Sequence, residues 1–324
     1  MTWLVTGGAG YIGSHVVKAL ADGGESVVVL DDLSTGSEAR IPSGVPLERG
    51  SVLDRALLDD VLNKHRVTGV VHIAAKKQVG ESVEQPLFYY RENVVGLQTV
   101  LEASAAAGIK HFVFSSSAAV YGMPDVDLVT EDTPCLPMSP YGETKLAGEW
   151  MVQAVGRAHG MATACMRYFN VAGAATPELG DPGAFNLVPM VFERIDAGES
   201  PLIFGDDYPT PDGTCVRDYI HVVDIASAHV AAARKLVAAP GTHLVLNIGK
   251  GEGVSVAEMI DVIREVSGHG DIKAEVAPRR PGDPARVVAA ADRIRAELGW
   301  EAGHDVRDMV ESAWAGWRHR HPQG

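Results

Sequence analysis

The 324-residue sequence contains little cysteine and few basic residues. Its three cysteines, Cys135, Cys165 and Cys215, lie far apart, without CxxC or metal-ligand spacing. This pattern argues against a disulfide framework and predicts no metal site. Lys and Arg number 28 against 42 Asp and Glu, so the net charge is −14. Such an acidic chain lacks the basic footprint of a nucleic-acid-binding protein.

Long apolar runs are also absent. The most apolar stretch, residues 225–240, contains His229, Arg234 and Lys235 and therefore cannot span a bilayer. No basic segment with a following apolar run precedes the first glycine-rich turn, so we expect no secretory signal. We expect a cytoplasmic protein with neither a membrane nor a nucleic acid as its partner.

Short apolar runs alternate with segments of helical period in the first half of the chain. Helices are predicted at 12–21, 54–65 and 94–107. Strands are predicted at 3–6, 26–30, 69–73, 110–115, 161–168 and 244–248. This alternation predicts an α/β fold with a Rossmann-type, doubly wound parallel sheet and a smaller C-terminal α/β substrate domain. We expect residues 1–174, with later contributions from about 216–250, to bind a nucleotide cofactor, and residues 175–324 to form mainly the substrate domain.

A glycine-rich turn follows the first predicted strand. Gly7, Gly10 and Gly13 have G-x-x-G-x-x-G spacing, which lets backbone approach a pyrophosphate at a helix N-terminus. Asp31 ends the second predicted strand, where a carboxylate can bind ribose hydroxyls and repel a 2′-phosphate. Asp32 follows, and no basic residue occurs between it and Arg40, so the sequence favours NAD over NADP.

A candidate catalytic pair begins another predicted helix. Ser139 and Pro140 suit a helix start, which puts Tyr141 and Lys145 one turn apart on one face. An ammonium group nearby lowers the pKa of a phenol, which is about 10 when unperturbed, and so makes it a usable base. Ser115–Ser117 end a predicted strand, where a parallel sheet presents ligands. The plainer alternatives are a solvated surface pair and a polar turn.

These features in this order resemble the extended short-chain dehydrogenase/reductase family. More narrowly, six stretches resemble the UDP-glucose 4-epimerases within it: residues 7–15, 79–82, 115–122, 167–170, 216–222 and 277–280. They span nearly the whole chain.

The resemblance implies an isomerase of galactose and wider carbohydrate metabolism. In that family NAD takes a hydride from C4 of the sugar and returns it to the other face of a 4-keto intermediate, which interconverts UDP-glucose and UDP-galactose. Carried onto this sequence, Tyr141 is the base, Lys145 lowers its pKa and holds the nicotinamide ribose, and Ser117 hydrogen-bonds the reacting 4-hydroxyl.

The resemblance also implies two binding sets. The cofactor set is Gly7, Gly10, Tyr11, Ile12, Gly13, Asp31, Asp32, Ser51, Val52, Ile73, Ala74, Lys77, Asn93, Tyr141, Lys145 and Phe169. The nucleotide-sugar set is Ser117, Asn170, Asn186, Leu187, Leu202, Ile203, Phe204, Arg217, Arg280, Asp283 and Val287. Ser51 stands where the family often has an aspartate that contacts adenine.

Val287 is the most informative departure. An ungapped alignment puts it where some members carry a bulky tyrosine that limits room for a 2-acetamido group, so we hypothesise that UDP-N-acetylglucosamine and UDP-N-acetylgalactosamine are also accepted. In the family, helices corresponding to residues 94–107 and to the segment after Tyr141 pair across a dimer interface, so we expect a homodimer. Burial within one chain explains their apolar faces equally well.

Three alternatives remain open. One is a UDP-glucuronate 4-epimerase, which needs a cation near C6 of the sugar. Another is a different nucleotide-sugar-modifying enzyme of the family, although a 4,6-dehydratase would carry a carboxylate near Ser115–Ser117. A protein of a different class, a non-catalytic NAD sensor, has no need to retain serine, tyrosine and lysine together.

Overall fold

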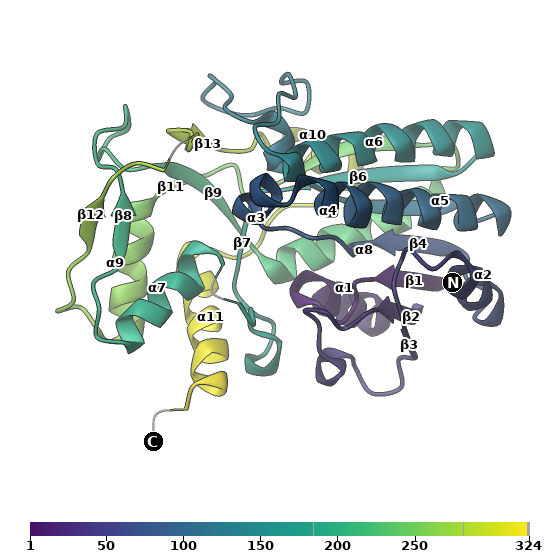
Figure 1. Ribbon diagram of the computed structural model, residues 1–324, viewed down its shortest axis with the longest axis horizontal. Helices are drawn as coiled ribbons and strands as arrows, with labels where there is room; N and C mark the ends of the chain where they lie inside the picture. The colour runs from purple at the N-terminus through teal and green to yellow at the C-terminus, as the bar shows by residue number, and fades with distance from the viewer. Residues whose placement is uncertain (184, 281, 323–324) are drawn as a thin grey trace.

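The computed structural model describes residues 1–183, 185–280 and 282–322. A seven-stranded parallel sheet, in the order β10-β6-β5-β4-β1-β2-β3, lies at its centre. Figure 1 places this sheet and its helices on the right and two smaller sheets on the left. The seven strands are β1 (Thr2–Thr6), β2 (Ser26–Asp31), β3 (Leu47–Arg49), β4 (Gly69–His72), β5 (His111–Ser117), β6 (Ala162–Tyr168) and β10 (His243–Ile248).

Helices cover both faces of this sheet. On one face, α1 (Tyr11–Asp22) and α8 (Val222–Ala238) pack together over alternate strand residues such as Val5 and Val29. On the other, α2 (Arg55–Lys64), α5 (Gly96–Ala106) and α6 (Pro140–His159) pack over the intervening residues, such as Leu4 and Val28. Apolar residues therefore fill both faces of the strands, as a buried parallel sheet requires.

The smaller part of the molecule is built on two short sheets. One contains β11-β9-β13, with β7 also paired to β9, and the other pairs β12 with β8. These strands are β7 (Asn170–Ala172), β8 (Leu202–Phe204), β9 (Val216–His221), β11 (Gly253–Ser255), β12 (Glu275–Ala277) and β13 (Arg286–Val287). A third core joins them to α7 (Leu187–Asp196), α9 (Val256–Ser267) and α11 (Val306–Arg320).

Short helical segments complete the described chain. They are η1 (Glu38–Arg40), α3 (Val79–Glu84), α4 (Pro86–Tyr89), η2 (Tyr90–Val95), η3 (Ala118–Tyr121), η4 (Pro177–Leu179) and α10 (Asp292–Leu298). No helix in the described residues is both long and apolar enough to cross a membrane.

The doubly wound parallel sheet predicted from the sequence is confirmed, and so are its six predicted strands and three predicted helices, to within a few residues. The elements predicted from the sequence did not include β3, α7 or the strands of the two small sheets. Within residues 216–250, β10 is a strand of the large sheet and α8 packs on that sheet, whereas β9 belongs to the second sheet.

Candidate active site

The residues predicted to carry chemistry gather at one edge of the large sheet. The glycine turn, Asp31, Ile73 and Ala74, the three serines, and Phe169 lie at or just beyond the carboxyl ends of β1, β2, β4, β5 and β6. The strand order reverses between β1 and β4. This is where doubly wound sheets open a crevice for ligands.

The glycine turn leaves no room for side chains. Gly7 has a φ of 72°, and a Cβ added to Gly13 would lie 2.0 Å from the Gly7 carbonyl oxygen. Gly10 occupies the N-cap of α1, and no side chain caps that end of the helix. The first turn of α1 therefore offers backbone N–H groups and the helix dipole to an anion.

Asp31 is tied to this turn. Its carboxylate accepts hydrogen bonds from the backbone N–H groups of Ala9 at 2.9 Å and Leu33 at 2.8 Å. Burial raises the pKa of Asp31, and these two hydrogen bonds act in the opposite direction. Asp32 is exposed at the surface and accepts from the Ser34 N–H at 2.9 Å.

Arg40 points away from the ribose side of Asp31. Its guanidinium donates to the carbonyl oxygens of Gly180 at 3.0 Å and Leu179 at 2.7 Å. It is therefore engaged at the junction of the two parts of the molecule, which removes the nearest sequence candidate for binding a 2′-phosphate.

The other cofactor candidates border the same crevice. The N–H groups of Ile73 and Ala74 donate to the Thr6 carbonyl, each at 3.1 Å. Asn93 lies in the π-helical turn η2, where its side chain accepts from Lys76 N–H at 2.8 Å and donates to Thr144 Oγ1 at 3.0 Å. Lys77 is exposed, and Ser51 and Val52 follow the edge strand β3.

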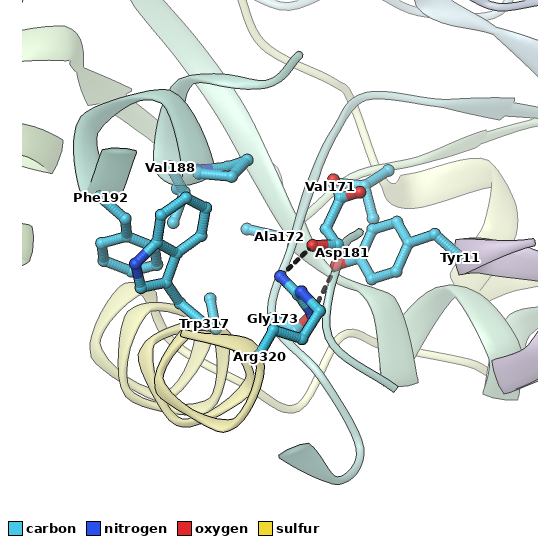
Figure 2. Close-up of a pocket in the computed structure, with 11 residues that line it drawn as sticks. Tyr11, Val171, Ala172, Gly173, Asp181, Val188, Phe192, Trp317 and Arg320 are labelled. Atoms are coloured by element: carbon cyan, nitrogen blue, oxygen red, sulfur yellow. Dashed lines mark hydrogen bonds between the residues drawn. The ribbon is translucent and has the colours of Figure 1, made fainter. Parts of the chain in front are cut away.

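Tyr11 differs from the other cofactor candidates because its side chain leaves the glycine turn. The phenol donates to the Gly173 carbonyl at 2.5 Å, beside Asp181 and Arg320, as Figure 2 shows. The cavity there encloses about 10 Å³, room for one water at most. Only the backbone of Tyr11 therefore remains at the glycine turn, and its ring packs between the two parts of the molecule.

The predicted helix start before Tyr141 is confirmed. Ser139 caps α6 by accepting from the Gly142 N–H at 3.2 Å, and Pro140 occupies the first turn. Lys145 Nζ lies 5.9 Å from the centroid of the Tyr141 ring and donates to the Ser115 carbonyl at 2.8 Å. Tyr141 and Ser117 are partly exposed, whereas Lys145 is buried.

Burial shifts the pKa of both members of the candidate pair. Burial raises the pKa of Tyr141, and hydrogen bonding with Ser117 opposes this rise. Burial lowers the pKa of Lys145 to about 7. Burial is therefore the main influence on both pKa values, and Ser117 is the side chain that opposes the rise at Tyr141.

A separate cavity of about 330 Å³ lies between α7 and the small sheets. It is within the size range of small-molecule sites. Nine of the eleven predicted nucleotide-sugar residues line it: Asn170, Asn186, Leu187, Leu202, Ile203, Phe204, Arg217, Arg280 and Asp283. The structure thus brings together residues from five separate stretches of chain.

Three arginines, Arg194, Arg217 and Arg280, line this cavity together with the carboxylates Glu193 and Asp283. Arg217 forms an ion pair with Asp283, and the Arg280 guanidinium lies 3.9 Å from the centroid of the Phe204 ring. Arginine forks of this kind bind phosphate oxygens in pairs. Arg279 lies outside the cavity lining, stacked on Tyr208 and bonded to Asp207.

Ser117 and Val287 do not line the cavity. Ser117 stays with Tyr141 at the end of β5, and Val287 is buried in a cluster with Tyr121 and Phe169. Val287 also pairs in register with Arg217, which lines the cavity.

Sequence reasoning missed several residues of the cavity wall. They are Phe185, Met190, Val191, Glu193, Arg194, Gly205, Cys215, Tyr219 and Val256. Met190, Val191, Glu193 and Arg194 belong to α7. Its apolar periodicity, with Val188, Val191, Phe192 and Ile195 buried, was the signal that could have revealed them.

Comparison with known proteins identifies the family. Residues 3–249 match the model of the NAD dependent epimerase/dehydratase family. This chain belongs to that family. A UDP-glucose 4-epimerase of Azospirillum brasilense is 48% identical, with 97% of this chain and 91% of the relative covered.

Solved structures agree. The UDP-glucose 4-epimerase of Stenotrophomonas maltophila, with bound NAD and formylated UDP-arabinopyranose, is 38% identical with a TM-score of 0.93 over 99% of each chain. The UDP-Glc/GlcNAc 4-epimerase of Campylobacter jejuni is 36% identical with a TM-score of 0.87, over 98% of this chain and 99% of that one. The resemblance to UDP-glucose 4-epimerases seen in the sequence is confirmed.

Proposed function

We propose that this protein is a UDP-glucose 4-epimerase that reversibly inverts C4 of UDP-glucose and UDP-galactose through a 4-keto sugar, with NAD as its cofactor. The observation that carries this proposal is the joint placement of Tyr141, Lys145 and Ser117 at the sheet edge beside the family's nucleotide-sugar cavity. Similarity to epimerases over nearly the full chain supports it.

The glycine turn fits NAD. A pyrophosphate needs bare backbone at the start of α1, and Gly13 has no space for a Cβ. Gly7, Gly10, Ile12, Gly13 and the Tyr11 backbone would hold the pyrophosphate, and Asp31 and Asp32 the adenosine ribose. Ser51, Val52, Ile73, Ala74, Lys77, Asn93 and Phe169 would line the rest of the site. When bound, NAD supplies the acceptor and donor of the C4 hydride.

The protein's own residues would accept the 4-hydroxyl proton and return it. Tyr141 takes the 4-hydroxyl proton in one half-reaction and returns it in the other, as a general base and then a general acid. Ser117 hydrogen-bonds the reacting oxygen and keeps the pKa of Tyr141 from rising further. Lys145, whose pKa lies at about 7, is protonated below neutrality and can offset the charge of the phenolate.

The nucleotide end of the substrate would occupy the 330 Å³ cavity. Arg217 and Arg280 would bind the diphosphate, and Asp283 would accept from the ribose. A diphosphate and Asp283 compete for the Arg217 guanidinium, so binding would exchange the ion pair for contacts with the ligand.

A broader substrate range is a second proposal, carried by Val287. Its small side chain separates the cavity from the catalytic group, where the 2-substituent of the sugar would lie. The similar structure of an epimerase named for both UDP-Glc and UDP-GlcNAc supports this.

We further propose a homodimer and a location in the cytoplasm. The exposed side chains Val83, Leu87 and Trp150 lie on α3, α4 and α6, which pack side by side, and a second copy would cover them. All three cysteines are free, which suits a reducing compartment.

Tyr141→Phe tests the proposed chemistry. The variant keeps the ring but cannot exchange the proton, so we expect conversion of UDP-galactose to UDP-glucose to fall by about 100-fold or more. Product sugars are separated by chromatography without added reductant, and bound NAD is quantified after denaturation. Tyr90→Phe, at a partly exposed tyrosine, is the matched control and should retain activity. Near-normal turnover in Tyr141→Phe would refute the assigned base.

A further inference from the structure

A buried ion pair lies behind the proposed catalytic group. The Glu149 carboxylate on α6 accepts from Arg167 Nε at 2.8 Å and from Arg167 Nη2 at 2.6 Å. The two side chains are only 2% and 6% exposed. Neither residue lines the nucleotide cavity, and the proposed proton transfer uses neither.

Glu149 completes a three-point attachment of α6 to β5. Lys145 donates to the Ser115 carbonyl at 2.8 Å, and the Ser116 hydroxyl donates to Glu149 at 2.5 Å. At the third point, Ser117 lies close enough to Tyr141 to lower the pKa of its phenol. Three consecutive residues of the strand therefore fix the position of the helix over its first turns.

Arg167 extends the attachment across the sheet. It is paired in register with Ser116, and its Nη1 donates to the Tyr121 hydroxyl at 2.7 Å. Tyr121 in turn donates to Asn247 on β10 at 2.6 Å. Tyr121 ends η3, which begins directly after Ser117. The network therefore holds the segments on both sides of Ser117.

Stability alone does not explain an ion pair at this place. Well-packed apolar residues often replace a buried pair without loss of stability. They lack the directional bonds that fix one register of a helix over a strand, and a misplacement of about 1 Å can cost about 100-fold in rate. Burial alone lowers the pKa of Lys145, so the charge of Glu149 is not what tunes it.

We propose that Glu149 and Arg167 are positioning residues, which set α6 against β5 so that Tyr141 and Lys145 meet Ser117 in the geometry the reaction needs. This inference rests on the proposed epimerase function. It adds two residues that act through others and touch neither substrate nor cofactor.

The double variant Glu149→Leu/Arg167→Met tests the pair in the NAD-loaded enzyme, because it removes both charges together and leaves neither one unpaired. We expect native circular dichroism, unchanged NAD content and an unchanged KM for UDP-galactose, with kcat lower by about 10- to 100-fold. A kcat equal to that of the wild type in a folded double variant overturns the proposal.

Ser116→Ala keeps the test decisive if the double variant does not fold. It removes only the hydrogen bond from β5 to Glu149, and we expect kcat to fall by about 3- to 10-fold without a change in KM. Ser104→Ala is the matched control, since Ser104 is fully buried and its hydroxyl has no partner among the described residues. Equal kcat values in the two variants would contradict a positioning role.

A spectroscopic readout separates this inference from the proposed function. The near-ultraviolet absorbance of phenolate, taken as the difference between each protein and its Tyr141→Phe counterpart, reports ionisation of Tyr141 without requiring turnover. We expect Ser116→Ala to move this ionisation to higher pH, because the base then loses part of its contact with Ser117. A wild type that cannot epimerise refutes the function, whereas superimposable titration curves refute the positioning role.

Discussion

Val287 illustrates how much one side chain can decide. It is 9% exposed and packs with Val120, Tyr121 and Phe169, between the elements that carry the proposed base and the cavity that contains Arg217. A larger side chain has little space among these neighbours and would have to displace part of its surroundings.

Val287→Tyr should therefore reduce the use of N-acetylated sugars selectively. We expect kcat/KM for UDP-N-acetylgalactosamine to fall by about 10-fold or more relative to that for UDP-galactose, since the tyrosine ring competes with the acetamido group for space. Measuring both substrates on one preparation cancels differences in folding. Val287→Ile, which keeps the β-branched shape, should preserve the ratio, and a loss equal for both sugars would contradict the model.

At the scale of elements, three histidines anchor helices as neutral rings. In α1, His15 accepts from the Ala175 N–H and donates to the Tyr11 carbonyl. His221 caps α8 by accepting from the Val223 N–H, and His229 within α8 donates to the Ile225 carbonyl. Burial lowers the pKa of all three to about 4.

These anchors predict acid sensitivity. Below pH 6.5 the unfolded chain binds a proton at each histidine, whereas the folded chain does so only near pH 4, so the free energy of unfolding falls as the pH drops through this window. The expected loss is about 2–3 kcal/mol for each histidine once pH 4 is reached. Urea unfolding between pH 7 and 4 measures it. His229→Leu should flatten the dependence, and the exposed His159→Ala should not; equal slopes in both would refute the assignment.

Some elements could be predicted from the sequence and others could not. Strands such as β1 and β4 could be predicted because both of their faces are buried and they read as continuous apolar runs. The start of α6 could likewise be predicted from Ser139 and Pro140. In contrast, β13 has two residues and β8 three, too few for any period, and they form only because distant segments bring them together.

The candidate site likewise combines features that the sequence predicts with features that only the fold creates. The sequence carried the glycine turn and the Tyr141–Lys145 spacing, both local patterns. It could not give the raised pKa of Tyr141 or the lowered pKa of Lys145, since both follow from burial. Arg217 and Asp283 are 66 positions apart, so their ion pair depends wholly on the tertiary fold.

For the whole molecule, the exposed apolar side chains on α3, α4 and α6 predict self-association. Trp150 is 64% and Leu87 82% exposed on neighbouring helices, an arrangement that a second copy of the chain would bury.

Trp150→Asp should convert the dimer to a monomer, because a carboxylate would be desolvated at the interface. Sedimentation velocity over a range of concentrations measures the mass. Val276→Asp is the control: Val276 is 57% exposed on β12, in the other part of the molecule, and its replacement should leave the mass unchanged. A wild type that sediments as a monomer would refute the homodimer.

The two sheets are interleaved along the chain, and this has a consequence for synthesis on the ribosome. β7 and β9 of the second sheet are synthesised before α8 and β10. α8 packs on α1, and β10 pairs with β6 to complete the edge of the large sheet. A nascent chain that has emerged only to residue 168 therefore has an unpaired strand edge and an uncovered apolar face. The large sheet becomes complete only after residue 248 has emerged, so the two halves of the active site must mature together.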